Sequence, residues 1–299
     1  MKTSVFRYII QQAELLNKSD RERTGETYMQ ALASFRKFRK GKDLAFSEID
    51  EPMIRCYEGY MRGLGLCRNT TSFYLRILRG IYNKAADDDL TEQKRPFRHV
   101  YTGVDRTSKR AVGIREIRLI KELDLEDNPR LSFARDMFIF SFYTRGMSFV
   151  DIAYLKKSDI SGEFLNYRRR KTGQRLTIRM EKGIAEIISR NSSDNSTYLL
   201  PIISSNDRAE ARKQYLAGMR AVNRNLKKIA GVLGIHQTLS MYVARHSWAS
   251  IALANDVPLH TISLALGHEN EETTRIYLAS VQTEAIDSAN SLILGLIEK

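Results

Sequence analysis

Apolar side chains in the first hundred residues recur at the three- and four-residue spacing of amphipathic helices. One such run covers 28–41, where a glycine ends it, and two more cover 52–61 and 69–82. Apolar positions spaced in this way line one face of a helix, and that face packs against neighbouring elements. Residues 1–103 are therefore predicted to form an all-helical domain.

The pattern changes further along the chain, where a short stretch of period two interrupts the helical spacing. The segment 104–111 is polar and basic with little apolar content, which is typical of an interdomain linker. Residues 112–299 are predicted to form a second, mixed α/β domain, so the whole chain should be mainly α with a small β-hairpin or sheet. The elements predicted there are helices over 115–123 and 131–143, strands over 164–169 and 175–178 joined by a turn at Thr172-Gly173, and helices from there to the end.

The chain carries a formal net charge of +13 over 299 residues, a length that suits two ordinary domains. Residues 1–103 contain 19 basic and 13 acidic side chains, and 104–299 contain 29 and 22. Both parts are basic, which favours a polyanion that contacts both of them. A merely basic, solvated surface is the alternative that charge alone leaves open.

The sequence favours a cytoplasmic protein without a membrane partner. No apolar run approaches the ~20 residues that a membrane span needs, and the N-terminus has no apolar stretch of signal-peptide length. Cys56 and Cys67 fit no metal-binding spacing, so they are expected to be ordinary reduced cysteines.

The helix predicted over 69–82 opens with several residues that commonly cap helices. The free backbone N–H groups of such a helix start favour a bound phosphate, and arginines flank this one. For any single residue, a solvated basic face on a capped core helix is an equally open interpretation. The candidate phosphate-binding residues are Arg68, Thr70, Thr71, Arg76 and Arg79.

Three motifs toward the C-terminus place an arginine, a histidine and a tyrosine in a fixed order. The first is Ala244-Arg245-His246, the second is Leu266-Gly267-His268, and Tyr277 comes nine residues after His268. This order and spacing resemble the catalytic half of the tyrosine recombinases, the phage integrase family. The resemblance extends over most of 112–299, and over 1–103 as a general helical pattern.

The resemblance implies a role for each of these residues in cutting and rejoining DNA. Arg245 would clamp the phosphate, because a guanidinium stays charged and forks onto two oxygens. His268 would hydrogen-bond the phosphate and assist proton transfer, while Tyr277 would attack and form a 3′-phosphotyrosyl intermediate. Lys171, in the predicted hairpin turn, is similar to the family lysine that protonates the leaving 5′-oxygen. The covalent intermediate keeps the energy of the broken bond, so neither a metal nor another cofactor is expected.

Two positions depart from the family pattern. Tyr242 stands where the family usually has a histidine; a phenol can donate one hydrogen bond to a phosphate oxygen, and buried packing is the equal alternative. The downstream residues Asp151 and Leu155 align Ser148 with the family's first arginine. Arg145 lies three residues earlier, about one helical turn, so a helix would put both on one face. Arg145 is therefore predicted to take the first clamp role.

A member of this family would have a helical core-binding domain over 1–103 and a catalytic domain over 112–299 that together clamp duplex DNA. The apolar stripe within 286–297 predicts a short C-terminal helix. The resemblance implies that this helix docks on a neighbouring subunit, and packing on its own core is the alternative. The implied assembly is a homotetramer on double-stranded DNA with paired recombination half-sites, which is compatible with accessory DNA-bending proteins.

The helices begin almost at residue 4, which favours the simple two-domain recombinases. The departures at Ser148 and Tyr242 resemble recombinases of the Bacteroides group, so DNA inversion is the preferred prediction, beside integration or excision of a mobile element. A type IB topoisomerase and a catalytically inactive DNA-binding relative are the rivals. The apolar C-terminal stripe disfavours the first, and retention of the four motif residues disfavours the second.

Overall fold

The computed structural model describes residues 4–19, 21–105, 111–192 and 196–278. The chain divides into two compact units, Met1–Thr107 and Ser108–Lys299. Helices dominate both units, and the second contains a three-stranded antiparallel sheet. The prediction of a mainly helical chain with a small sheet is confirmed. Most of the predicted linker lies outside the described residues.

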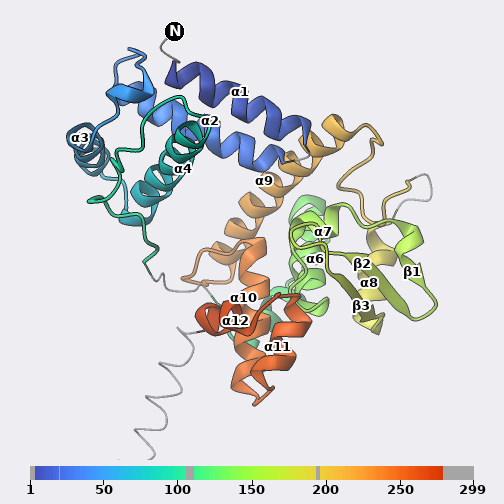
Figure 1. Ribbon diagram of the computed structural model, residues 1–299. Helices are drawn as coiled ribbons and strands as arrows, with labels where there is room; N and C mark the ends of the chain where they lie inside the picture. The colour runs from blue at the N-terminus through green and yellow to red at the C-terminus, as the bar shows by residue number, and fades with distance from the viewer. Residues whose placement is uncertain (1–3, 20, 106–110, 193–195, 279–299) are drawn as a thin grey trace, which may run out of the picture. The chain divides into compact units, whose positions relative to one another are not determined.

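The first unit is a group of helices (Figure 1), and their buried faces carry several aromatic side chains. Phe35 and Tyr57 are fully buried and meet edge to face, with ring centroids 5.1 Å apart. Ser4 and Asp50 begin two of the helices, because their side-chain oxygens accept from backbone N–H groups of the first turn. The described helices are α1 (Val5–Lys18), α2 (Glu22–Phe38), the 3-10 turn η1 (Phe46–Glu48), α3 (Glu51–Gly63) and α4 (Arg68–Asp87).

The second unit is built around α6 (Pro129–Tyr143), whose consecutive residues 137–140 are all buried. Four successive buried positions point to all sides of a helix, so α6 is surrounded by other elements. It packs against α5, α8, α9 and α10. The other elements described here are α5 (Ile114–Glu122), α7 (Phe149–Ala153), η2 (Lys157–Asp159), β1 (Ile160–Ser161), β2 (Phe164–Arg168), β3 (Arg175–Arg179), α8 (Lys182–Asn191), α9 (Arg208–Val232), α10 (Met241–Ala254), α11 (Leu259–Leu266) and α12 (Glu271–Leu278).

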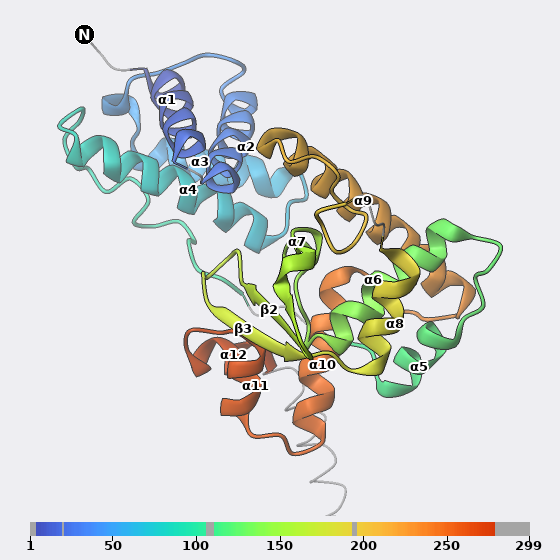
Figure 2. The same ribbon diagram turned by 90° about the vertical axis from the view of Figure 1, so that its right-hand side faces the viewer.

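The sheet has the order β1-β2-β3, with Leu165 of β2 opposite Ile178 of β3. These two apolar side chains face the main core of the unit, and the outward positions of both strands are polar except for Phe164. The two predicted strands are confirmed, while β1 is too short to give a period-two signal. Figure 2 shows β2 and β3 running side by side.

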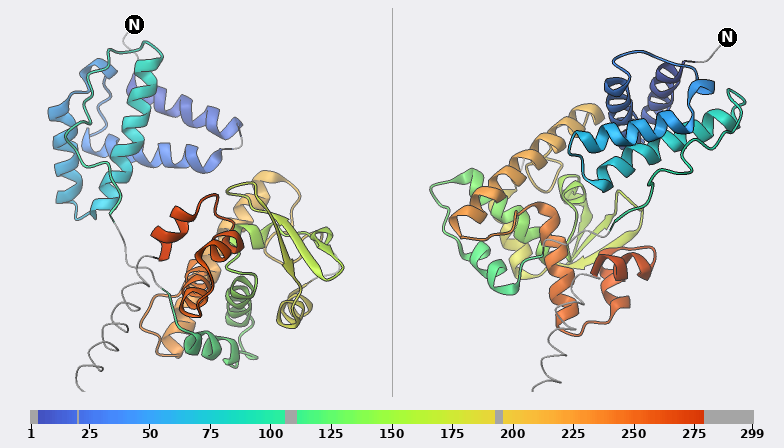
Figure 3. Two further views of the ribbon diagram at one scale, coloured as in Figure 1. Left: turned by 60° about the horizontal axis from the view of Figure 1, so that its bottom comes forward. Right: turned by 90° about the vertical axis from the view of Figure 1, so that its left-hand side faces the viewer.

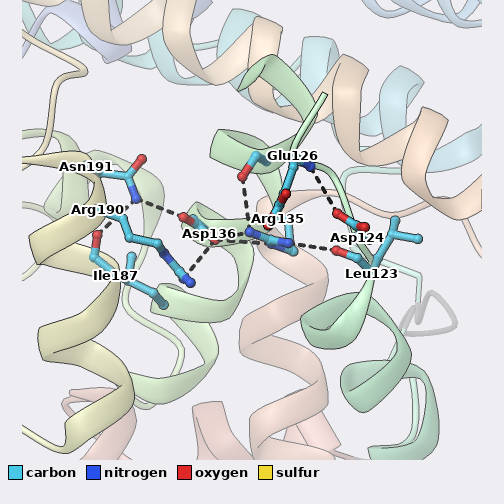
Figure 4. A network of polar contacts seen from close by, with 9 residues as sticks. Leu123, Asp124, Glu126, Arg135, Asp136, Ile187, Arg190 and Asn191 are labelled. Carbon is cyan, nitrogen blue, oxygen red and sulfur yellow. Dashed lines mark hydrogen bonds and ion pairs between the residues drawn. The ribbon is translucent and has the colours of Figure 1, made fainter. Parts of the chain in front are cut away.

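A buried carboxylate fixes α8 to α6 (Figure 4). Asp136 accepts from Arg190 Nη2 at 3.2 Å and from Asn191 Nδ2 at 2.8 Å, both at the end of α8. Its neighbour Arg135 donates to Asp136 and to the carbonyl of Leu123 after α5. The charge of Asp136 is thus compensated by two guanidinium groups, as a buried carboxylate requires.

The last two described helices, α11 and α12, pack against the second half of α10 (Figure 3). α10, α11 and α12 share a cluster of buried apolar residues that includes Ala249, Ile262 and Leu278. α11 ends at Gly267, which adopts the left-handed conformation with φ +65° and thereby turns the chain toward α12. His268 follows directly, so its position is set by this turn.

Candidate active site

Arg245, on α10, is a buried arginine that is only 4% exposed. Its Nη1 donates to the carbonyl of Gly146 at 2.8 Å, and its Nη2 donates to the carbonyl of Leu266 at 2.6 Å. Nη2 also lies 3.1 Å from His268 Nε2. The guanidinium therefore joins the turn after α6 to the end of α11.

The turn after α6 contains Arg145, the residue predicted to be the first arginine of the phosphate clamp. Arg145 and Gly146 both have positive φ, +57° and +75°. A Cβ on Gly146 would lie 2.7–2.9 Å from atoms of Arg245, so only glycine allows this close approach. Arg145 reaches across to β3, with Nη1 3.4 Å from the carbonyl of Thr177.

The expectation that Arg145 and Ser148 share a helix face is wrong. Arg145 lies in the turn, and Ser148 is the extended N-cap residue of α7. Ser148 Oγ donates to Asp151 Oδ2 at 2.6 Å. The two residues therefore have different surroundings, and the hydroxyl of Ser148 is used in its hydrogen bond to the buried carboxylate of Asp151.

Asp151 also holds the turn that contains Lys171. The backbone N–H of Arg170 donates to Asp151 Oδ1 at 2.8 Å. Lys171 is next in the chain and its side chain is exposed, at the tip of the segment between β2 and β3. Its charge is near enough to His268 to help lower the pKa of that residue.

His268 lies between Arg245 and Thr274, and these two contacts determine which ring nitrogen carries the proton. Burial, and after it the positive charges of Arg245, Arg169 and Lys171, together lower the pKa of His268 to about 4. The ring is therefore neutral at pH 7. Because a guanidinium can only donate, Nε2 is the acceptor, and Nδ1 carries the proton and donates to Thr274 Oγ1 at 2.7 Å.

Tyr277 lies on α12, three residues after Thr274, which is about one helical turn. Thr274 and Leu278 are buried and fix this helix against its neighbours. The side chain of Tyr277 lies outside the described part of the structure. The backbone places the residue one turn from the partner of His268.

The Tyr242 side chain is 56% exposed near the start of α10, so buried packing is excluded. Its ring meets His246 edge to face, with centroids 4.4 Å apart. His246 is buried within α10.

Tyr167 lies close to several charged residues of the site. Burial raises the pKa of Tyr167 on β2, and Asp151 raises it further, while Arg245, Arg169 and Arg145 oppose the shift. The phenol therefore stays protonated. Three arginines from separate segments are close enough to act on one side chain, and Arg169 among them was not singled out by the sequence.

The candidate phosphate-binding residues of the first unit fall into two groups on α4. Arg68 and Arg79 are exposed and contact the segment 101–105, Arg68 through the ring of Tyr101 and Asp105, and Arg79 through Thr102. Arg76 is exposed as well.

The threonines of this set lie differently. Thr71 is only 2% exposed, which argues against a direct contact with a ligand, and Thr70 is half-buried beside Cys67. Cys67 is the N-cap residue and has no side-chain capping bond, so the expected capped start of this helix is wrong. Asn69 binds the backbone of Asp105 instead.

The described residues also bear on metal binding and on membrane spans. No cluster of three or more His, Cys, Asp or Glu side chains there is arranged to hold a metal ion. None of the described helices has the length and apolar character to cross a membrane.

Comparison with known proteins identifies both units. Residues 4–100 match the Phage integrase SAM-like domain, and residues 121–284 match the Phage integrase family. The chain is 26% identical over 275 residues to tyrosine recombinase XerD of Rhizobium meliloti (strain 1021), covering 85% of the chain and 84% of that relative. It is 29% identical over 248 residues to tyrosine recombinase XerA of Thermococcus onnurineus (strain NA1), covering 80% and 81%.

Solved structures share the fold at low identity. A lambda integrase dimer bound to a COC′ core site matches with a TM-score of 0.67 at 14% identity, over 90% of this chain and 96% of that one. The XerH recombinase bound to a palindromic difH substrate matches with a TM-score of 0.64 at 16% identity, over 89% and 78%.

Proposed function

The chain belongs to the phage integrase family and is a tyrosine recombinase, and we propose that it cleaves and rejoins duplex DNA at specific sites through a covalent bond between Tyr277 and a DNA 3′-phosphate. The observation that carries this proposal is a chain of contacts. His268 lies 3.1 Å from Arg245 and 2.7 Å from Thr274, and Tyr277 follows Thr274 by one turn of α12. The phosphate clamp Arg245, the neutral base His268 and the backbone position of the nucleophile Tyr277 are thus neighbours in space.

In the cleavage step, the phenol oxygen of Tyr277 bonds to phosphorus and the bond from phosphorus to the 5′-oxygen breaks. His268 accepts the phenol proton at Nε2, which exchanges its hydrogen bond from Arg245 for this proton when the guanidinium turns to the bound phosphate; the lowered pKa keeps the ring neutral beforehand. Lys171 Nζ gives a proton to the leaving 5′-oxygen. Attack by another 5′-hydroxyl reverses these steps and reseals the strand.

Arg245 and Arg145 stabilise the charge that builds on the two non-bridging oxygens during attack. Arg145 owes its positive φ to the turn that ends α6, where the N–H of Gly146 donates to the carbonyl of Ser141. The assignment of Arg145 rests on its place next to Gly146, which lies against Arg245.

We assign 1–103 to a core-type DNA-binding domain, 104–111 to a linker and 112–299 to the catalytic domain. The exposed Arg68, Arg76 and Arg79 on α4 supply phosphate contacts in the first domain. The protein is cytoplasmic in this proposal.

The assembly we propose is a homotetramer on paired half-sites, since lambda integrase is known as a tetramer bound to a Holliday junction. The apolar stripe within 286–297, which lies outside the described residues, is the candidate subunit-docking helix. DNA inversion is the preferred reaction, with integration or excision of a mobile element as the alternative.

Incubation with a nicked suicide duplex tests the nucleophile. The native protein should give a protein–DNA adduct on a denaturing gel, and Tyr277→Phe should bind the duplex and give none. Tyr242→Phe should still form the adduct. An adduct that persists in Tyr277→Phe and disappears in Tyr242→Phe would move the nucleophile to α10.

A further inference from the structure

We propose that Arg169 is a positioning residue for cleavage: its buried side chain locks the turn that carries Lys171 to the corner that carries His268. The inference rests on the function proposed above, in which Lys171 protonates the leaving oxygen. Arg169 does not touch the DNA in this proposal and acts through the backbone on either side of it.

Arg169 differs from its neighbours in burial. It belongs to a run of four cations, 168–171, and is 8% exposed while the other three are exposed. Side chains alternate along a strand, so Arg169 follows Leu165 and Tyr167 onto the inner face of β2. Its backbone closes the turn, because its N–H donates to the carbonyl of Gln174 at 2.8 Å and its carbonyl accepts from Gly173 at 2.7 Å.

The side chain of Arg169 ends on the last turn of α11. Its Nη1 donates to the carbonyl of Gly267. A guanidinium at a helix C-terminus both satisfies a free carbonyl and complements the negative end of the helix dipole. A Cβ on Gly267 would lie 3.3 Å from Arg169 Cδ and 3.0 Å from Leu176 Cδ1, so the hairpin and the corner are in close contact.

Two buried arginines therefore hold adjacent carbonyls at the end of α11. Arg245 binds the carbonyl of Leu266 and Arg169 binds that of Gly267, immediately before His268. The turn has a second anchor, since Asp151 accepts from the backbone of Arg170. Lys171 itself is exposed, so the two anchored residues before it determine where its ammonium group lies.

Loss of the Arg169 anchor should misplace the proton donor. A displacement of about 1 Å can lower a rate by ~10²-fold, and general acid catalysis as a whole contributes about 10²–10⁴-fold. Arg169→Ala should therefore slow adduct formation by ~10²-fold on an ordinary suicide duplex. Because both variants would act on the same proton transfer, adding Arg169→Ala to Lys171→Ala should slow cleavage little further.

A duplex with sulfur in place of the scissile 5′-bridging oxygen isolates this effect. The leaving group is then a thiolate, which departs without a proton because the pKa of a thiol is only about 8.5. On this substrate Arg169→Ala and Lys171→Ala should both react within several-fold of the native protein. Arg168→Ala, the exposed neighbour, is the matched control and should be near native on both substrates.

Arg169→Lys keeps a cation and most of the buried stem, so it provides a second variant that retains the fold. It should show a smaller loss on oxygen and the same recovery on sulfur. Equal slowing of Arg169→Ala and Arg169→Lys on both substrates, or native rates on the oxygen substrate, would overturn the positioning role. A native protein that forms no adduct with either duplex would instead refute the proposed function.

Discussion

Replacing Arg145 should mainly lower the rate of cleavage, whereas replacing Ser148 should mainly lower the stability of the fold. Arg145 makes one long contact, 3.4 Å to the carbonyl of Thr177, which lies beyond the usual range of N–H···O bonds. Its truncation should change the free energy of unfolding by less than about 0.5 kcal/mol. As a donor to the transition state it should contribute ~2.7 kcal/mol or more, so Arg145→Ala should slow cleavage by ~10²-fold or more.

Ser148→Ala should do the opposite. It removes a 2.6 Å hydrogen bond to the buried carboxylate of Asp151. Hydrogen bonds to charged groups contribute about 1.5–3 kcal/mol, so the melting temperature should fall by several degrees. At a temperature where the variant is folded, cleavage should stay within about tenfold of native.

Arg145→Gly sharpens the comparison, because glycine adopts φ +57° without strain. This variant should be as stable as the native protein or more stable by up to about 1 kcal/mol, and it should cleave as slowly as Arg145→Ala. Single-turnover adduct formation on a suicide duplex, beside thermal melting of each variant, gives both quantities. A severe cleavage defect in Ser148→Ala beside a mild one in Arg145→Ala would reverse the assignment of the first clamp arginine.

Three further predictions concern the rest of the mechanism. Cleavage should proceed in excess EDTA without ATP, and a strict Mg²⁺ requirement for adduct formation would contradict the covalent scheme. The pKa of His268, lowered to about 4 from about 6.5, means that the unfolded chain takes up the proton first. Stability from this group is therefore complete above about pH 6.5 and lost as pH falls toward 4, a slope that His268→Asn should remove in melting curves recorded from pH 4 to 7. Deleting 286–299 should leave half-site gel shifts intact but abolish cooperative full-site binding and recombination; lost half-site binding with a lowered melting temperature would show that this segment packs on its own domain.

The sequence predicts the motif residues and the elements that carry them, because each signal is local. Helical spacing located α2, α3 and α4, and period two located β2 and β3. Tyr277 is predicted as the nucleophile by its distance from His268 alone. These patterns depend on which face of an element is buried, and that is encoded within a few turns of chain.

The parts that could not be predicted depend on contacts between distant segments. Arg169 is one of four consecutive cations, and nothing in the run marks it as the buried one. Gly146 lies against Arg245, about a hundred residues away in the chain, and no local pattern predicts this approach. The first turn of α4 was assigned to capping, whereas Asn69 binds the backbone of Asp105. In each case a tertiary contact outweighed the local preference.

The contacts of the arginines determine how much of each positive charge remains available at the site. Arg190 binds the carboxylate of Asp136, and this pairing cancels charge on both sides. Arg245 and Arg169 instead donate to the backbone carbonyls of Gly146, Leu266 and Gly267. A carbonyl dipole orients a guanidinium without cancelling its net charge, so the positive field remains available to an anion that approaches the site. Cations held in this way need no reorganisation when charge develops on a phosphate, which is the condition for strong transition-state stabilisation without a metal.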